Sequence, residues 1–259
     1  MDEILLDRDA GVLTLTFNRL AKKNALTPSM YAAMADALVQ AAADATLAVV
    51  VIQGHETVFS AGNDIGDFLQ RTATTGESPA FQFLRAISTF AKPLVAAVCG
   101  PAVGIGTTML FHCDLVYAGD NAAFSMPFVN LGLCPEAASS YLAPQLMGHG
   151  RAAEALLLGE PFLAETALEM GLVSRIVAPM EVAALAQRQA RKLAAKPMRS
   201  LMETKRLMKS AQAAVVAQRM TEEGQSFARL LLEPAAREAF TACLERRRPD
   251  WQSAAKLDS

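Results

Sequence analysis

The chain has 259 residues, of which 52% are hydrophobic and 19% charged, and its formal net charge is −2. A chain this long and apolar can bury a core, which excludes the disordered, collagen and coiled-coil classes. The near-neutral charge gives no general attraction to nucleic acid or anionic membranes. We therefore expect a folded protein with neither of these partners.

The ends of the chain and the cysteines predict a cytoplasmic protein. The start, MDEILLDRDA, is acidic where a secretory or transit peptide is basic, and the end, AAKLDS, lacks a peroxisomal tripeptide. No apolar run reaches the roughly 18 residues needed to span a bilayer. We expect buried, reduced thiols without metal-binding spacing at Cys99, Cys113, Cys134 and Cys243.

The first half of the chain alternates between predicted strands and helices. Residues 12–18 (VLTLTFN) alternate like a half-buried strand, and Thr27 followed by Pro28 is typical of a helix start. Apolar runs predict buried strands at 47–53, 94–98 and 114–117, with helices near 79–90 and 106–111. This order indicates the α/β class.

Amphipathic helices are expected from about residue 180 onward. Their apolar stripes are Val182, Leu185, Ala186 and Leu193, then Val216, Met220, Gly224, Phe227 and Leu231, then Ala236, Ala239, Phe240 and Cys243. Such helices either cover the protein's own core or dock onto a second subunit, and the pattern fits both.

Common catalytic motifs are absent from the sequence. Gly104 and Gly106 begin a dinucleotide-binding pattern, but Met109 stands where its third glycine belongs. There is no phosphate-binding loop, no HExxH spacing and no GxSxG elbow. We therefore expect no metal and no separate cofactor.

Three segments suit acyl chemistry. Residues 58–65 are interpreted as a strand entering a glycine turn, and 100–108 as a strand, a turn and a helix. Two such junctions can direct backbone N–H groups at one oxyanion. Residues 133–140 place Glu136 among apolar and small residues, where burial raises a carboxyl pKa and favours proton abstraction. The structural alternative is ordinary turns and a glutamate that favours a helix start.

Residues 59–65 read FSAGNDI, 100–106 read GPAVGIG, and 113–118 read CDLVYA. These segments, followed by 162–177 and 244–249, resemble the signatures of the crotonase (enoyl-CoA hydratase/isomerase) superfamily in order and spacing. The resemblance implies a crotonase-type ββα spiral core at 1–195, which binds acyl-CoA and carries out catalysis. It also implies a C-terminal helical region at 196–259 that forms homotrimers or hexamers.

The resemblance further implies the ligand and the site residues. The ligand is an acyl-CoA thioester, so coenzyme A is part of the substrate. The backbone N–H groups of Asn63 and Ile105 align with the oxyanion donors, and Ile105 replaces a usual glycine and reshapes the pocket. The residues that align with substrate-binding positions are Lys22, Ala61, Gly62, Asn63, Asp64, Ile65 and Ile105.

The carboxylates favour one branch of that superfamily. The two glutamates of its hydratases align with Thr108 and Phe128, neither of which can transfer the proton. Residues 134–141 (CPEAASSY) resemble the PEGxSS segment of the peroxisomal-type Δ3,Δ2-enoyl-CoA isomerases, whose catalytic glutamate matches Glu136, with Ala137 in place of the glycine. We expect this isomerase activity. The alternatives are a weak hydratase, a thioesterase or a non-catalytic acyl-CoA-binding module.

Other contacts are predicted with less detail. Eight basic residues and one acidic residue lie between Arg188 and Lys209, either as a solvated helix face or as a contact for the 3′-phosphate of CoA. Ile105, Met126 and Phe128 are candidates for the acyl pocket.

Overall fold

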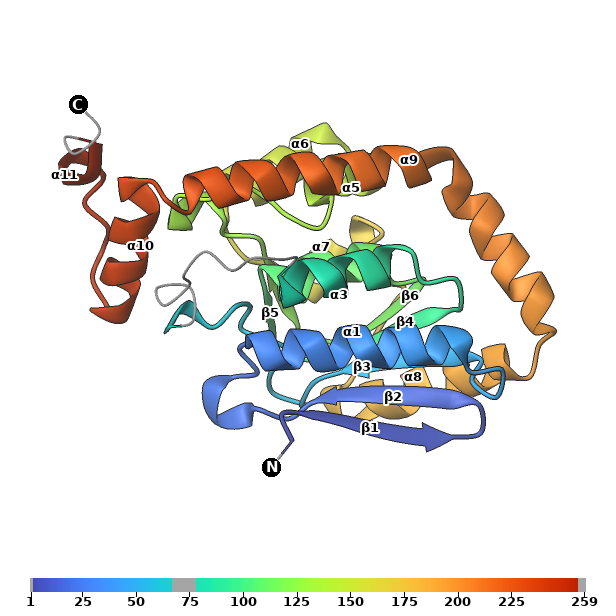
Figure 1. Cartoon of the computed structure of the whole chain (residues 1–259). Helices are drawn as coiled ribbons and strands as arrows, with labels where there is room; N and C mark the ends of the chain where they lie inside the picture. Colours follow the sequence, from blue (N-terminus) through green and yellow to red (C-terminus); the bar gives the residue numbers. More distant parts are fainter. Residues whose placement is uncertain (1, 67–77, 256–259) are drawn as a thin grey trace.

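A six-stranded sheet forms the centre of the protein in the computed structural model, which describes residues 2–66 and 78–255 (Figure 1). Its order is β1 (Ile4–Asp9), β2 (Val12–Phe17), β3 (Val49–Gln53), β4 (Leu94–Val98), β6 (Leu115–Gly119) and β9 (Arg175–Val177). The β1–β2 pair is antiparallel and the other pairs are parallel. A three-stranded sheet contains β5 (Pro101–Val103), β7 (Ala123–Ser125) and β8 (Phe162–Leu163).

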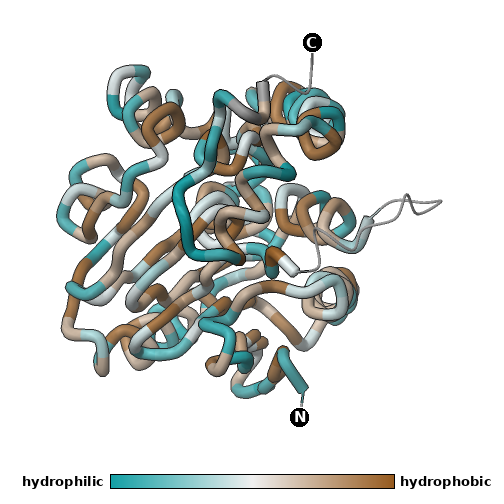
Figure 2. Tube along the Cα trace, turned by 90° about the vertical axis from the view of Figure 1, so that its left-hand side faces the viewer, coloured by the Kyte–Doolittle hydropathy of each residue, from teal (hydrophilic) through white to brown (hydrophobic). Residues whose placement is uncertain are grey.

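Helices cover both faces of the larger sheet. On β3, Val50 and Ile52 belong to the core that also contains buried residues of α1 (Pro28–Ala43) and α3 (Pro79–Ser88). The alternate residues Val49 and Val51 pack in the core with α8 (Pro179–Ala194). Burial on both faces explains the continuous apolar sequence of these strands. Figure 2 shows hydrophobic residues along these central strands and hydrophilic residues in many outer turns.

The remaining short helices include α4 (Ile105–Thr108) and α7 (Ala164–Glu169), which contact the second sheet. The others are η1 (Leu20–Lys22), η2 (Met109–His112), η3 (Val129–Leu131), α5 (Ser139–Met147), α6 (His149–Ala153) and η4 (Glu154–Leu158). The long helix α9 (Met198–Leu230) changes direction partway along, and its second part runs beside α5 (Figure 1). Helices α10 (Pro234–Leu244) and α11 (Trp251–Ala255) follow. Within the described ranges, no helix is both long and apolar enough to cross a membrane.

The predicted strands and helices are largely confirmed, including the Thr27 cap, whose hydroxyl accepts from the Met30 amide at 3.2 Å. Two predictions are wrong. Residues 58–65 do not form a strand; Val58 and Ser60 make isolated bridges, because the chain turns immediately after them. Of the four thiols expected to be buried, only Cys99 is fully buried; Cys113 and Cys134 are half-buried. Cys243 is exposed, because the buried face of α10 is formed by other residues.

The four cysteines are free thiols. The division at residue 195 falls just after α8 and before α9, and it stays a prediction.

Candidate active site

Two turns lie side by side at the edge of the small sheet. The amides of Phe59 and Ser60 both donate to the carbonyl of Pro101 at 3.1 Å, and the Val103 amide donates to the Ser60 carbonyl at 2.9 Å. Gly62 has a positive φ of 86°, and a Cβ there would lie 2.8 Å from the Val103 carbonyl oxygen. Glycine is therefore required for these two backbones to approach.

The candidate oxyanion donors belong to these turns. Asn63 follows Gly62, and Ile105 follows Gly104, which has a φ of +56°. Neither the Asn63 nor the Ile105 amide donates a hydrogen bond to another described residue. The structure thus places both candidate amides in adjacent turns with unused N–H groups. The Ile105 side chain is 1% exposed and packs in the main core, so the predicted reshaping of the pocket by this side chain is not seen.

A tyrosine that sequence analysis did not single out orients Asn63. The Tyr31 hydroxyl of α1 donates to Asn63 Oδ1 at 2.6 Å. The backbone on either side is fixed as well, because the Leu26 amide donates to the Gly62 carbonyl at 2.7 Å and the Asp64 amide to the Leu26 carbonyl at 3.0 Å. These contacts hold the first turn rigidly against α1.

The other predicted substrate-binding positions lie around the same turn. Asp64 pairs with Arg19 at 2.7 Å, and this hydrogen bond lowers the pKa of the Asp64 carboxyl. The Ala61 amide donates to the Lys23 carbonyl at 2.9 Å. Lys22 is exposed at the end of η1. The Ala61 and Asp64 amides are therefore used within the chain, and contact of these positions with CoA stays a prediction.

Glu136 faces the residue that aligns with one of the hydratase glutamates. The Thr108 hydroxyl, at the end of α4, donates to Glu136 Oε1. Burial raises the pKa of the Glu136 carboxyl to about 8; the Thr108 hydrogen bond lowers it in part, and the nearby Glu223 carboxylate raises it further. Both protonation states of this carboxyl are accessible near neutral pH, as a general acid–base requires.

The turn that contains Glu136 has an unusual backbone. Ala137 and Ala138 have φ values of +61° and +56°, in the left-handed region that favours glycine. The amide and hydroxyl of Ser139 both donate to the Glu136 carbonyl, at 3.0 and 2.6 Å. Helix α5 begins at Ser139, so the structure places Glu136 before the helix, not in its first turn.

Two more side chains hold this turn from outside, and sequence analysis missed both. Glu223 on α9 accepts from the amides of Ala138 at 2.6 Å and Ser140 at 2.9 Å. The His112 ring Nε2 lies 2.9 Å from the Ala137 carbonyl, to which it donates. The sequence held one indication that Glu223 is buried: it is a carboxylate among the residues of the apolar stripe predicted for this helix.

A cavity of about 210 Å³ opens beside the Asn63 turn. Its lining includes residues 61–63, Ile65 and Phe128, with Phe227 and Phe240 from the C-terminal helices. Of the three side chains expected at the acyl pocket, only Phe128 lines this cavity; Ile105 and the fully buried Met126 do not.

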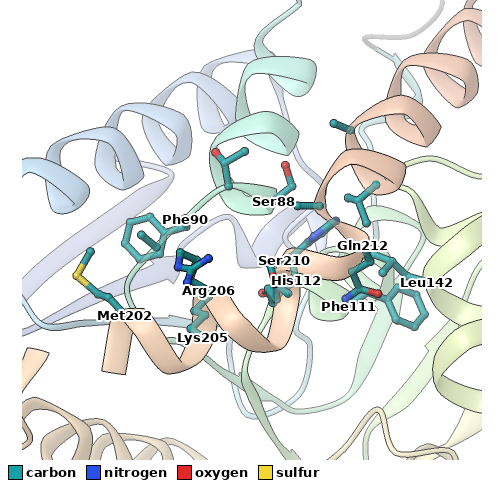
Figure 3. Close-up of a pocket in the computed structure, with 16 residues that line it drawn as sticks. Ser88, Phe90, Phe111, His112, Leu142, Met202, Lys205, Arg206, Ser210 and Gln212 are labelled. Carbon is teal, nitrogen blue, oxygen red and sulfur yellow. Dashed lines mark hydrogen bonds between the residues drawn. The ribbon is translucent and has the colours of Figure 1, made fainter. Parts of the chain in front are cut away.

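A larger cavity of about 420 Å³ lies between the end of α3 and α9 (Figure 3). Its lining includes Phe90, His112, Leu142 and Lys205, but none of the predicted catalytic residues. We do not assign it to the reaction, because the candidate donors and Glu136 lie elsewhere. His112 nevertheless forms part of its wall and contacts the Glu136 turn.

Lys205 fits neither prediction for the basic segment at 188–209, which were a solvated helix face and a contact for the 3′-phosphate of CoA. It is 8% exposed and donates to the Asp114 carboxylate at 2.7 Å and to the Lys92 carbonyl at 2.8 Å. It is therefore neither solvated nor available to a phosphate, because its charge is already paired inside the protein.

Comparisons with known proteins identify the family and the fold. The family model described as "Enoyl-CoA hydratase/isomerase" matches residues 7–254. A structure of OdaA from Pseudomonas aeruginosa is 44% identical with a TM-score of 0.91, and the match covers 93% of this chain and 98% of that one. An enoyl-CoA hydratase/isomerase from Pseudoalteromonas atlantica T6c is 37% identical with a TM-score of 0.93, covering 96% of this chain and 100% of that one. The predicted crotonase-type α/β fold is thereby confirmed.

Curated relatives include both activities. Enoyl-CoA delta isomerase 2 of Rattus norvegicus is 42% identical over 67% of this chain, and the match spans 46% of that protein's length. The 2,3-dehydroadipyl-CoA hydratase of Escherichia coli K12 is 32% identical over 97% of this chain and 99% of its own. The chain thus spans about half of the isomerase and nearly all of the hydratase.

Proposed function

Because the chain belongs to the enoyl-CoA hydratase/isomerase family, we propose that it is a Δ3,Δ2-enoyl-CoA isomerase. One observation carries the proposal: Glu136 lies opposite Thr108, the position that aligns with one of the two glutamates of a hydratase. Of the two carboxyls near this turn, Glu223 accepts hydrogen bonds from two backbone amides, whereas Glu136 accepts one from the Thr108 hydroxyl. One such carboxyl suffices for an isomerase, since the same group removes and returns a proton.

The proposed reaction moves one proton between two carbons of the substrate. Glu136 removes a proton from C2 of a 3-enoyl-CoA, and the electrons shift to give a dienolate. The Asn63 and Ile105 amides stabilise its oxygen, a contribution of about 3–4 kcal/mol per donor. The protonated Glu136 then delivers the proton to C4, which leaves trans-2-enoyl-CoA. Coenzyme A enters and leaves as part of the substrate, and the steps require no separate cofactor.

The runner-up is hydration of a 2-enoyl-CoA, which the full-length similarity to a hydratase favours. It requires a group that activates water and a group that protonates C2. Thr108 and Phe128 occupy the aligned glutamate positions, which argues against efficient hydration. A thioesterase and a non-catalytic acyl-CoA-binding protein are distinguished by the same experiment.

The test uses purified protein and trans-3-hexenoyl-CoA, with the ultraviolet absorbance of the conjugated thioester as readout. We expect conjugated product from wild type and a loss of about 10³-fold in Glu136→Gln, since general acid–base catalysis supplies about 10²- to 10⁴-fold. The control is Glu203→Gln, at an exposed glutamate of α9, which should react like wild type. Absence of conjugated product from wild type would refute the isomerase. Mass spectrometry then separates a hydrated product, free CoA thiol and unchanged substrate.

We also propose that the C-terminal helices assemble a homotrimer or hexamer. Large apolar side chains are exposed there, including Leu232, Leu244 and Trp251. Light scattering would show a mass three or six times that of the chain, and a monomer would exclude this assembly. Cytoplasmic localisation stays a prediction.

A further inference from the structure

Glu223 is a buried carboxylate that the proposed reaction does not use. It is 5% exposed and reaches across from α9 to the start of α5, where Oε2 accepts from the Ala138 amide and Oε1 from the Ser140 amide. Both donors lie within four positions of Glu136. Two backbone N–H groups suit an ionised carboxylate, since it has acceptors only.

The segment that receives these bonds needs external support. Ala137 and Ala138 both occupy the left-handed region, which is unfavourable for alanine and persists where the surroundings fix it. Glu223 binds the second of these residues, and His112 binds the carbonyl of the first. Without Glu223, the Ala138 and Ser140 amides lose their acceptor inside the protein, and the turn is free to relax.

We propose that Glu223 is a positioning residue for Glu136: it fixes the turn that directs the Glu136 carboxyl and places a second negative charge beside that carboxyl. The catalytic consequence rests on the proposed function, in which Glu136 is the base. The structural consequence does not, and it is testable without turnover.

The groups around the two carboxyls define the electrostatic effect. Glu136 faces the Thr108 hydroxyl, the Cys134 thiol and Glu223. Burial raises the pKa of the Glu223 carboxyl, while its hydrogen bonds to Ser140 and Ala138 and the cation of Arg219 on its own helix oppose this shift. Glu223 is also near the Cys134 thiol. The burial of His112 lowers its pKa to about 4, so this ring adds no charge at neutral pH. Removal of the Glu223 charge should therefore lower the pKa of Glu136.

The first test measures ionisation and backbone exchange in the ligand-free protein. Carbon-13 NMR of glutamates labelled at the carboxyl carbon, with the Glu136 signal assigned by its absence in Glu136→Gln, follows the titration of Glu136. We expect Glu223→Gln to lower the Glu136 midpoint and to speed hydrogen exchange of the Ala138 and Ser140 amides at least tenfold. In this variant the amide group can accept from only one of the two N–H donors.

Two further variants separate charge from position. Glu222→Gln changes the exposed neighbour on the same helix and should leave the Glu136 titration and the exchange unchanged. Glu223→Asp keeps the charge on a shorter side chain, so it should keep the high Glu136 midpoint while exchange becomes faster. It also provides a folded test if Glu223→Gln does not fold. A Glu136 titration and exchange equal to wild type in both Glu223 variants would overturn the proposal.

Turnover of trans-3-hexenoyl-CoA gives the kinetic test. Displacement of a catalytic group by about 1 Å costs roughly 10²-fold, so we expect kcat of Glu223→Gln to fall about 10- to 100-fold. KM should change less than about twofold, because the binding surface is intact, and the acidic limb of the pH profile should move to lower pH. A kcat equal to that of wild type, together with an acidic limb at the same pH as in wild type, would refute the catalytic consequence. Absence of turnover in wild type refutes the isomerase alone.

Discussion

The two parts of α9 each bring a buried charge to the core, and the two charges are held in opposite ways. Lys205, in the first part, meets the opposite charge of Asp114 at 2.7 Å. Glu223, in the second part, is held by two neutral backbone amides and lies near another carboxyl, Glu136. Paired opposite charges stabilise a fold without shaping a reaction. Like charges beside a strained turn are typical of sites that are shaped for chemistry.

The largest expected effect comes from breaking the ion pair that Lys205, in the first part of α9, forms with Asp114. Lys205→Met leaves the Asp114 carboxylate without its close partner; Lys209 remains at 3.9 Å. We expect a loss of about 3 kcal/mol in the free energy of unfolding, because the half-buried Asp114 carboxylate keeps only the more distant Lys209 as a partner. Urea unfolding measures it. The control is Arg206→Met, which breaks an exposed pair with Glu203 and should cost no more than about 0.5 kcal/mol. Equal losses in the two variants would contradict the assignment.

The second effect is the pH dependence of the proposed reaction, which takes place at the turn held by the second part of α9. In the proposed reaction Glu136 must be ionised to remove a proton, and burial raises its pKa to about 8. We expect kcat/KM to rise with pH and level off above pH 8, increasing about fifty-fold between pH 6 and pH 8. Stopped-flow absorbance across this range measures the profile. A constant rate would show that Glu136 is not the base.

A smaller effect concerns His112, which contacts both Lys209 of α9 and the turn that contains Glu136. Lys209 donates to the His112 carbonyl at 3.0 Å, and the His112 ring binds the Ala137 carbonyl. His112→Leu should cost about 1–2 kcal/mol in the free energy of unfolding at pH 7, because the buried Ala137 carbonyl loses its donor.

The same histidine predicts a pH window. Burial lowers the pKa of His112 to about 4, whereas an unfolded histidine has a pKa of about 6.5. Its stabilising contribution is therefore complete above about pH 6.5 and declines as the pH falls towards 4. Urea unfolding at pH 7 and pH 5 should show a smaller decline in His112→Leu than in wild type. Parallel declines would mean that another group is responsible.

The smallest effect tests the backbone of the turn. In Ala137→Gly, relief of the left-handed conformation offsets the lost methyl group and the greater flexibility of the unfolded chain. We expect a change within about 0.5 kcal/mol. Ala186→Gly, at a fully buried position in the regular helix α8, should instead lose about 1.5 kcal/mol or more. A large loss at position 137 would show that the methyl group matters more than the backbone.

The sequence was sufficient where the deciding residues are close along the chain. The strands around β3 were predictable because burial on both faces leaves a continuous apolar run. Strand β1 was missed because only its first residue is buried, so no alternating pattern marks it. Strand β5 was predicted within residues 100–108, whereas β7 and β8 are too short to stand out.

The same limit applies to the site. Glu136, Asn63 and Ile105 lie in local segments that resemble known signatures. Tyr31 orients Asn63 from 32 positions away, a contact that only the folded chain creates. Thr108 was singled out because it aligns with a hydratase glutamate. Its hydrogen bond to Glu136, however, also depends on the fold.

The hydrogen bond from Ala138 to Glu223 joins residues 85 positions apart, and this separation has a consequence for biosynthesis. Residues leave the ribosome in order, so the turn that contains Glu136 emerges well before the helix that restrains it. A nascent chain that ends at residue 222 contains every predicted catalytic residue but lacks that restraint. We expect such a chain to form its six-stranded sheet while the proposed proton-transfer group is still loosely held, so that the site is completed only after α9 has been translated.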